Sequence, residues 1–134
     1  TMVKSLKFFT VICVLFFSFQ SLSAQTIFEK WPEIKSFHEV MSQTYHPSEE
    51  GNLNPIKTRI DEMVKKAEAL QTSTPKEFNT PEIIVSEKKI YTDSVALQKL
   101  IAEKAGDETI TAALEGLHEE FHKIIGLCND NGDH

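Results

Sequence analysis

The feature that most constrains this fold is the spacing of apolar residues, which recur every three or four positions in four successive segments. In the first segment, Ile34, Phe37, Met41 and Tyr45 share one face of a helix. The other three segments carry similar stripes, and none shows the strict alternation that is typical of a strand. Four amphipathic helices with short connections predict an all-α fold, an antiparallel up-down-up-down four-helix bundle.

Proline, glycine and capping residues predict where these helices begin and end. Pro32 suits the first turn of the first helix, and Pro47 should end that helix by His46, because proline disfavours helical backbone in the preceding residue. The tail after Cys128 should fray. The expected starts of the other helices are Asn54 capping before Pro55, Thr80 capping before Pro81, and Asp107 capping after Gly106.

The first residues have the layout of a secretory signal peptide. Two lysines precede an apolar run, residues 8–19, and small residues then offer a cleavage site after Ala24. The run is shorter than the roughly 20 apolar residues that a spanning helix needs, which disfavours a membrane anchor. We therefore expect residues 1–24 to be a cleaved signal peptide and residues 25–134 to form one bundle domain, periplasmic or secreted.

Charge and cysteine content narrow the possible partners. Cleavage would remove Lys4 and Lys7 and no acidic residue, which lowers the formal net charge from −6 to −8. An acidic chain without a basic cluster disfavours nucleic acid and anionic membrane surfaces as partners. Only Cys128 would remain, so no internal disulfide is expected and packing alone must hold the fold.

Histidines on two helices indicate a ligand site. His118 and His122 lie four residues apart beside the inward stripe of the fourth helix, close enough for two imidazoles to share one ion. His38 lies within the stripe of the first helix. In an antiparallel pair it falls level with Phe121 or with Gly116, depending on which ends of the helices are aligned. Helix bundles hold metals and haem between facing helices in this way.

Other helices supply donors near the same level. Met41 and Met63 fall close to the level of His38, and Glu87 is a looser match. Imidazoles with a thioether suit copper, and imidazoles with a carboxylate suit zinc or nickel. The ordinary alternative for each residue is that the histidine is a hydrogen-bonded core residue and the methionine is packing.

A second cluster lies in the connection after the first helix. His46 and Glu50, with Glu49 between them, would form a separate ion site at one end of the bundle. The turn chemistry of Pro47 and Gly51 explains much of this stretch without a ligand. The metal ligands predicted from the sequence are His38, Met41, His46, Glu50, Met63, His118 and His122.

The sequence does not have the full ligand set of a di-iron carboxylate enzyme. The fourth helix has two Glu-x-x-His pairs, but a di-iron carboxylate site needs such a pair on each of two helices. A Cys-x-x-Cys-His sequence for covalent haem and a glycine-rich phosphate loop are also missing. We also expect no zinc-protease site of the His-Glu-x-x-His type. We therefore expect a binding protein and not an enzyme.

The size and layout of the mature chain resemble bundles of the cytochrome b562 type. Such bundles hold b-type haem between a methionine on the first helix and a histidine late on the fourth. The resemblance implies Met41 with His122 or His118 as haem ligands. It covers the four-helix layout and no motif, and Met41 lies well inside the first helix, so haem b is the alternative cofactor.

Two stretches, HEVMSQTYHPSEEGNLNPIK and LHEEFHKIIGLC, resemble small secreted four-helix-bundle proteins of Bacteroidota that accompany heavy-metal efflux genes. The resemblance implies metal handling with an efflux system as partner, and it names no activity. The expected function is thus to bind a copper or zinc ion for buffering or delivery. A metal-free interaction or chaperone bundle would expose an apolar patch, whereas the stripes here are expected to face inward.

Overall fold

The computed structural model describes residues 22–132, and every regular element in this range is helical, as the sequence predicts. Residues 1–21, which are nearly all of the predicted signal peptide, lie outside the described range, as do the last two residues. The elements are α2 (Leu22–Lys30), α3 (Pro32–Glu49), α4 (Asn54–Thr72), the short 3₁₀ helix η1 (Lys76–Phe78), α5 (Pro81–Ala102) and α6 (Asp107–Gly132).

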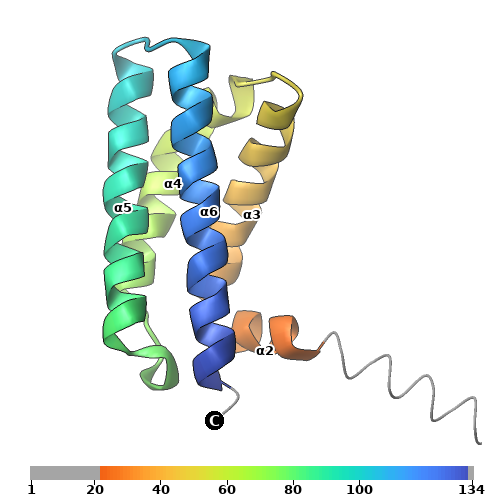
Figure 1. Ribbon diagram of the computed structural model, residues 1–134, viewed down its shortest axis with the longest axis vertical. Helices are drawn as coiled ribbons and strands as arrows, with labels where there is room; N and C mark the ends of the chain where they lie inside the picture. Colours follow the sequence, from red (N-terminus) through yellow and green to blue (C-terminus); the bar gives the residue numbers. More distant parts are fainter. Residues whose placement is uncertain (1–21, 133–134) are drawn as a thin grey trace, which may run out of the picture.

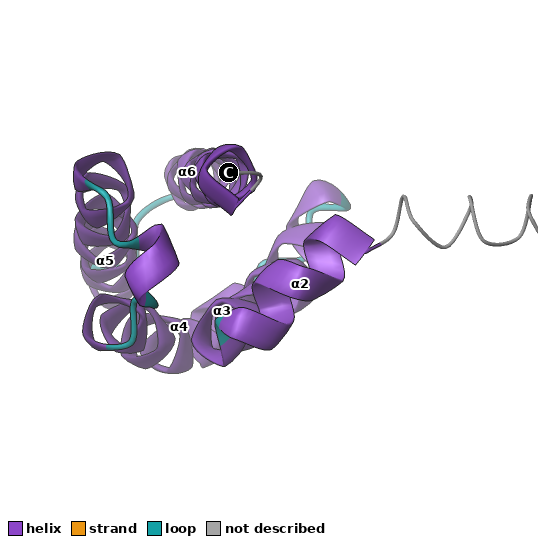
Figure 2. Cartoon of the chain, turned by 90° about the horizontal axis from the view of Figure 1, so that it is seen from below, coloured by secondary structure: helices purple, strands orange, loops and turns teal. Residues whose placement is uncertain are grey.

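The four long helices pack in sequence order, α3 against α4, α4 against α5 and α5 against α6. The contact between α6 and α3, which would close the bundle, is much smaller. Seen end-on in Figure 2, α6 and α3 stand at the two ends of the row of long helices. The short helix α2 lies across the lower end of the molecule and contacts both of them (Figure 1).

Apolar side chains from all five α-helices form one core. On α3 the predicted stripe is buried at Ile34, Phe37 and Met41, and on α5 Ile83 and Ile90 are fully buried. Each such side chain contributes about 1.5–3 kcal/mol relative to an exposed one. The apolar spacing therefore predicted correctly which side of these helices faces the core.

Helix α2 is an element that the sequence did not predict. Ile27 on this helix is buried in the core, and the Phe28 ring lies 5.3 Å from the ring of His38. Trp31, which separates α2 from α3, is fully buried. The predicted cleavage after Ala24 would leave these three aromatic and aliphatic contacts on the mature chain.

Helix starts follow the predicted signals, with two corrections to the caps. The Thr80 side chain caps α5 by accepting a hydrogen bond from the Ile83 N–H at 3.3 Å, as predicted. Asn54 is not the cap of α4, because it is the first residue of that helix. Its N–H donates instead to the side-chain oxygen of Asn52 at 3.1 Å. Asp107 is likewise the first residue of α6 and not its cap.

Two helix ends differ from the prediction. Helix α3 does not stop at His46 but continues through Pro47 to Glu49. Proline is tolerated there because it lies in the last turn, where its missing N–H costs one hydrogen bond without breaking a long helix. The chain then reverses at Gly51, which has a positive φ of 84°. Helix α6 also runs beyond Cys128 to Gly132, where a frayed tail was expected.

The stripes do not all face inward. On α5 the large apolar side chains Ile84, Val85 and Val95 are exposed, by 42 %, 65 % and 37 %. The expectation of closed stripes is therefore wrong for this helix, because it carries apolar residues on more than one face. Within residues 22–132, no helix combines the length and the hydropathy needed to cross a bilayer.

Candidate metal centre

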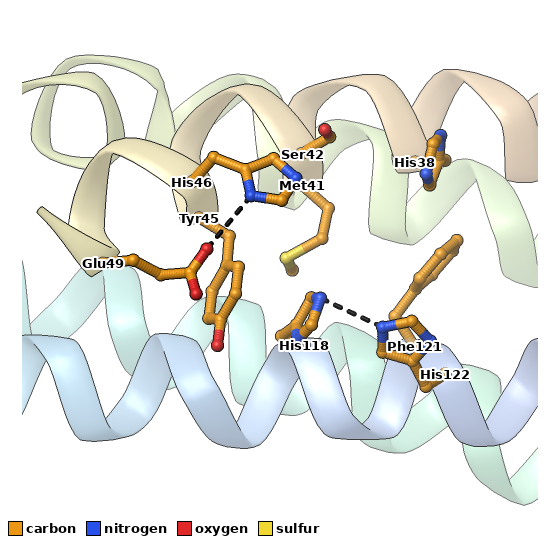
Figure 3. Close-up of a pocket in the computed structure, with 9 residues that line it drawn as sticks. All are labelled: His38, Met41, Ser42, Tyr45, His46, Glu49, His118, Phe121 and His122. Carbon is orange, nitrogen blue, oxygen red and sulfur yellow. Dashed lines mark hydrogen bonds and ion pairs between the residues drawn. The ribbon is translucent and has the colours of Figure 1, made fainter.

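A pocket of about 330 Å³ lies where α3 faces α6 (Figure 3), and we call it the seam pocket. All four histidines predicted to bind a metal line this pocket. His118 and His122 are close together, and Figure 3 shows His46 and His38 toward its two ends. Its walls come from α3 and α6, whose contact is the smallest between neighbouring long helices. The residues that line it are His38, Met41, Ser42, Tyr45, His46, Glu49, His118, Phe121 and His122.

His118 and His122 form a close pair on α6. Their Nε2 atoms lie 3.1 Å apart and their rings are perpendicular. Two nitrogens bound to one metal at about 2.0–2.1 Å lie about 2.9 Å apart at a right angle and about 3.3 Å apart at the tetrahedral angle. The observed separation falls between these values. The pair can therefore share one proton as a hydrogen bond, or share one metal ion after small ring rotations.

Tyr45 of α3 covers one face of His118. The two rings are stacked in parallel, with centroids 3.8 Å apart and an angle of 7° between their planes. Burial lowers the pKa of His118, and the neighbouring His122 lowers it further, whereas Glu49 and Glu119 act in the opposite direction. A lowered pKa keeps this imidazole neutral near pH 7, which is the form that binds metals.

Met41 brings a thioether to the same pocket. Its side chain is only 1 % exposed, so the sulfur belongs to the inner wall and not to the mouth. In Figure 3 it extends from α3 toward α6, with the sulfur directed at the His118 ring. The thioether is a soft donor of the kind that favours copper.

His46 and Glu49 form the outer edge of the seam pocket. The Nδ1 atom of His46 lies 3.0 Å from Oε1 of Glu49, three residues later on α3, and both side chains are more than half exposed. Metal-binding histidines commonly donate their second ring N–H to a carboxylate in this way. The hydrogen bond leaves Nε2 of His46 available to a ligand.

His38 occupies the opposite end of the pocket. Its ring lies 5.6 Å from that of Phe121 and 5.3 Å from that of Phe28. The contact with Phe121 agrees with one of the two predicted alignments and excludes the one that placed His38 level with Gly116. Aromatic rings therefore separate His38 from the other imidazoles.

Three candidates from the sequence do not line the seam pocket. Met63 is fully buried in α4, and Glu50 is exposed just after α3. Glu87 is buried in α5, where its carboxyl group is hydrogen-bonded to the hydroxyl group of Thr74. In place of Glu50, its neighbour Glu49 contacts His46.

The histidine pair of α6 belongs to a sequence motif that the sequence analysis did not identify. Residues 118–122 read HEEFH, which has the His-Glu-x-x-His spacing of zinc hydrolases, so the expectation that the chain lacks such motifs is wrong here. The motif lies on a helix, as it does in those enzymes. Glu119, the residue in the position of the general base, is exposed and does not line the seam pocket.

The nitrogen and oxygen donors do not by themselves complete a site. Among the side chains that the structure describes, no group of three or more His, Cys, Asp or Glu residues is arranged to hold a metal ion. The thioether of Met41 is a donor of a different type. The donor set at the centre of the seam pocket is thus two imidazoles beside one buried sulfur.

Comparison of the chain with protein-family models, with curated proteins and with solved structures found no match. The resemblances to Bacteroidota proteins and to cytochrome b562 bundles therefore remain predictions.

Proposed function

We propose that this protein binds a copper or zinc ion in the seam pocket and serves to buffer it or deliver it to an efflux system. His118 and His122 would supply the first two ligands through Nε2. Met41 and His46, both on α3, are the candidates for a further donor, and His38 lies at the far end of the pocket. In this proposal the protein binds its ion and catalyses no reaction.

The observation that carries the proposal is the separation of 3.1 Å between the Nε2 atoms of His118 and His122. Ring stacking by Tyr45 supports it, since a stacked imidazole loses little freedom when it binds an ion. An incomplete donor set suits delivery, because an ion held by few protein ligands has open positions for a recipient.

Charge near the pocket supports cation binding. Glu49 and Glu119 both act electrostatically on His118 and on Tyr45, and Glu115 acts on Tyr45 as well. The chain as a whole is acidic, with a formal net charge of −6. A negative potential over a half-open pocket raises the local concentration of cations and their rate of entry.

The proposed setting is outside the inner membrane. We propose that residues 1–24 are removed as a signal peptide and that the remainder is an antiparallel up-down-up-down bundle. In Figure 1 the connections from α3 to α4 and from α5 to α6 lie at the upper end, and that from α4 to α5 at the lower end, which supports this topology.

A zinc hydrolase is the second candidate, favoured by the HEEFH sequence. In such an enzyme, Glu119 would take a proton from a zinc-bound water. Against it, Glu119 lies outside the seam pocket, and no third nitrogen or oxygen ligand is in place among the described residues. These two observations make ion binding the better-supported function.

Haem and a metal-free interaction module are weaker candidates. Met41 and His122 do line one pocket, as a b-type haem would require, but about 330 Å³ is near the lower limit for organic ligands. The exposed Ile84, Val85 and Val95 of α5 favour an interaction surface. That surface is independent of the seam pocket and does not account for the histidines.

Metal analysis tests the proposal. The full sequence is exported by an expression host, its N-terminus is read by mass spectrometry, and copper and zinc are titrated into the purified protein. Wild type should bind one ion per chain, and a His118→Ala/His122→Ala variant should bind none. Lys123→Ala, an exposed neighbour on α6 outside the pocket, is the matched control. Equal binding by the double variant would rule out this site.

A further inference from the structure

We infer that the seam pocket selects cuprous copper, Cu(I), over zinc, and that the buried thioether of Met41 makes this choice. The inference rests on the proposed function, because it names the ion of that same site. It assigns Met41, and not His46 or Glu49, as the donor that completes the pair formed by His118 and His122.

The number and type of donors in the seam pocket favour Cu(I). Zinc in structural sites takes four ligands, drawn from cysteine, histidine and carboxylates. Among the described side chains no three residues of those types converge. Cu(I) is satisfied by fewer and softer donors, and thioethers favour it while adding little to zinc sites. Two imidazoles and one thioether therefore match Cu(I) better than Zn²⁺.

The buried position of Met41 also favours a monovalent ion. At 1 % exposure its sulfur is shielded from water, so a metal that it binds sits on the inner side of the pocket. The aromatic rings of Tyr45 and Phe121 also line the pocket. A monovalent ion loses less hydration energy there than a divalent one, because the cost of desolvation rises steeply with charge.

The outer edge of the seam pocket carries the side chains that would favour a divalent ion instead, His46 and Glu49. A divalent ion would gain from the carboxylate of Glu49, which is 53 % exposed and already hydrogen-bonded to His46. Recruiting both side chains would require breaking or sharing that bond and drawing exposed side chains inward. The thioether of Met41 is already buried at the pocket and extends toward His118 (Figure 3).

The deciding variant is Met41→Leu, which removes the sulfur and nearly conserves volume. Met63→Leu is the matched control, because Met63 is also fully buried but lies outside the seam pocket. Cu(I) affinity is measured without oxygen by competition with bicinchoninate, and zinc affinity by competition with a chromogenic chelator. Met41→Leu should weaken Cu(I) binding by about tenfold or more and leave zinc binding unchanged. Met63→Leu should change neither.

Wild-type affinity for Cu(I) that survives in Met41→Leu would overturn the inference, and so would an equal loss for both ions. X-ray absorption of the wild-type Cu(I) complex gives a readout that needs no variant. Copper–sulfur scattering is expected, and a shell of nitrogen and oxygen alone would also overturn the inference. If wild type binds neither ion, the proposed function itself fails, which is a distinguishable result.

Discussion

Replacing Tyr45 with alanine should raise the pKa of His118 toward the ordinary value of a histidine. Burial is the main cause of the lowered pKa, and the Tyr45 ring, stacked at 3.8 Å, covers one whole face of the imidazole. His122 contributes to the shift and remains in the variant, so the recovery should be partial. Tyr45→Phe keeps the ring and serves as the control. The measurement is an NMR titration of the imidazole protons in metal-free protein.

The same substitution has a calculable effect on stability. Losing the stacked pair removes about 1 kcal/mol, and truncating a half-buried ring removes about 1–2 kcal/mol more. For a domain of this size the Tm should fall by roughly 8–12 °C. Tyr45→Phe should stay close to wild type, because the ring and its packing are retained.

The pH dependence follows from the direction of the shift. The pKa of His118 is lower in the folded chain than the value of about 6.5 expected when unfolded. Protonation therefore favours unfolding, so the contribution of His118 to stability is fully present above about pH 6.5 and is lost as pH falls through the lowered pKa. Tyr45→Ala should narrow this window. An unchanged pKa of His118 in a folded Tyr45→Ala variant would refute the assignment of burial by Tyr45 as the cause.

Two further predictions concern the interior beyond the seam pocket. Burial raises the pKa of Glu87, against the opposing hydrogen bond from Thr74, so the contribution of Glu87 to stability should be fully present below about pH 4.5 and be lost as pH rises through the raised pKa. Glu87→Gln should lack this decline in urea unfolding, and parallel pH profiles for the two proteins would contradict it. Burial also raises the pKa of Cys128 to about 12, so a thiol reagent at mildly alkaline pH should label it only after unfolding. Fast labelling of the native protein would show the thiol to be accessible.

The fold was largely predictable because its signals are local. Apolar spacing sets the buried face of each helix, and Thr80 before Pro81 marks a helix start through a cap that needs no tertiary contact. Pro47 misled the prediction, since its effect depends on its distance from the helix end. Helix α2 was missed because its residues overlap the expected cleavage region, and its contacts with the bundle, such as those of Ile27 and Phe28, are tertiary.

The site was predictable only in part, because periodicity tells which residues are inside but not which helix pair they face. Met41 and Met63 have the same spacing signal, yet α3 borders the α6 seam and α4 does not reach the pocket. His118 and His122 were found because a pair four apart on one helix must be close. The stack of Tyr45 on His118 depends on how α3 and α6 approach each other, which no local pattern encodes.

The placement of these groups has a physical reason that connects fold to function. The interface of α3 with α6 is the smallest between neighbouring long helices, so it cannot exclude water with aliphatic packing alone. Imidazole and phenol rings suit such an interface, because each has an apolar face to stack and a polar edge that tolerates water. His118 uses both properties, stacking on Tyr45 while its Nε2 faces His122. A bound ion would join α3 to α6 where the bundle is least held together, so occupancy of the site and closure of the seam would favour each other.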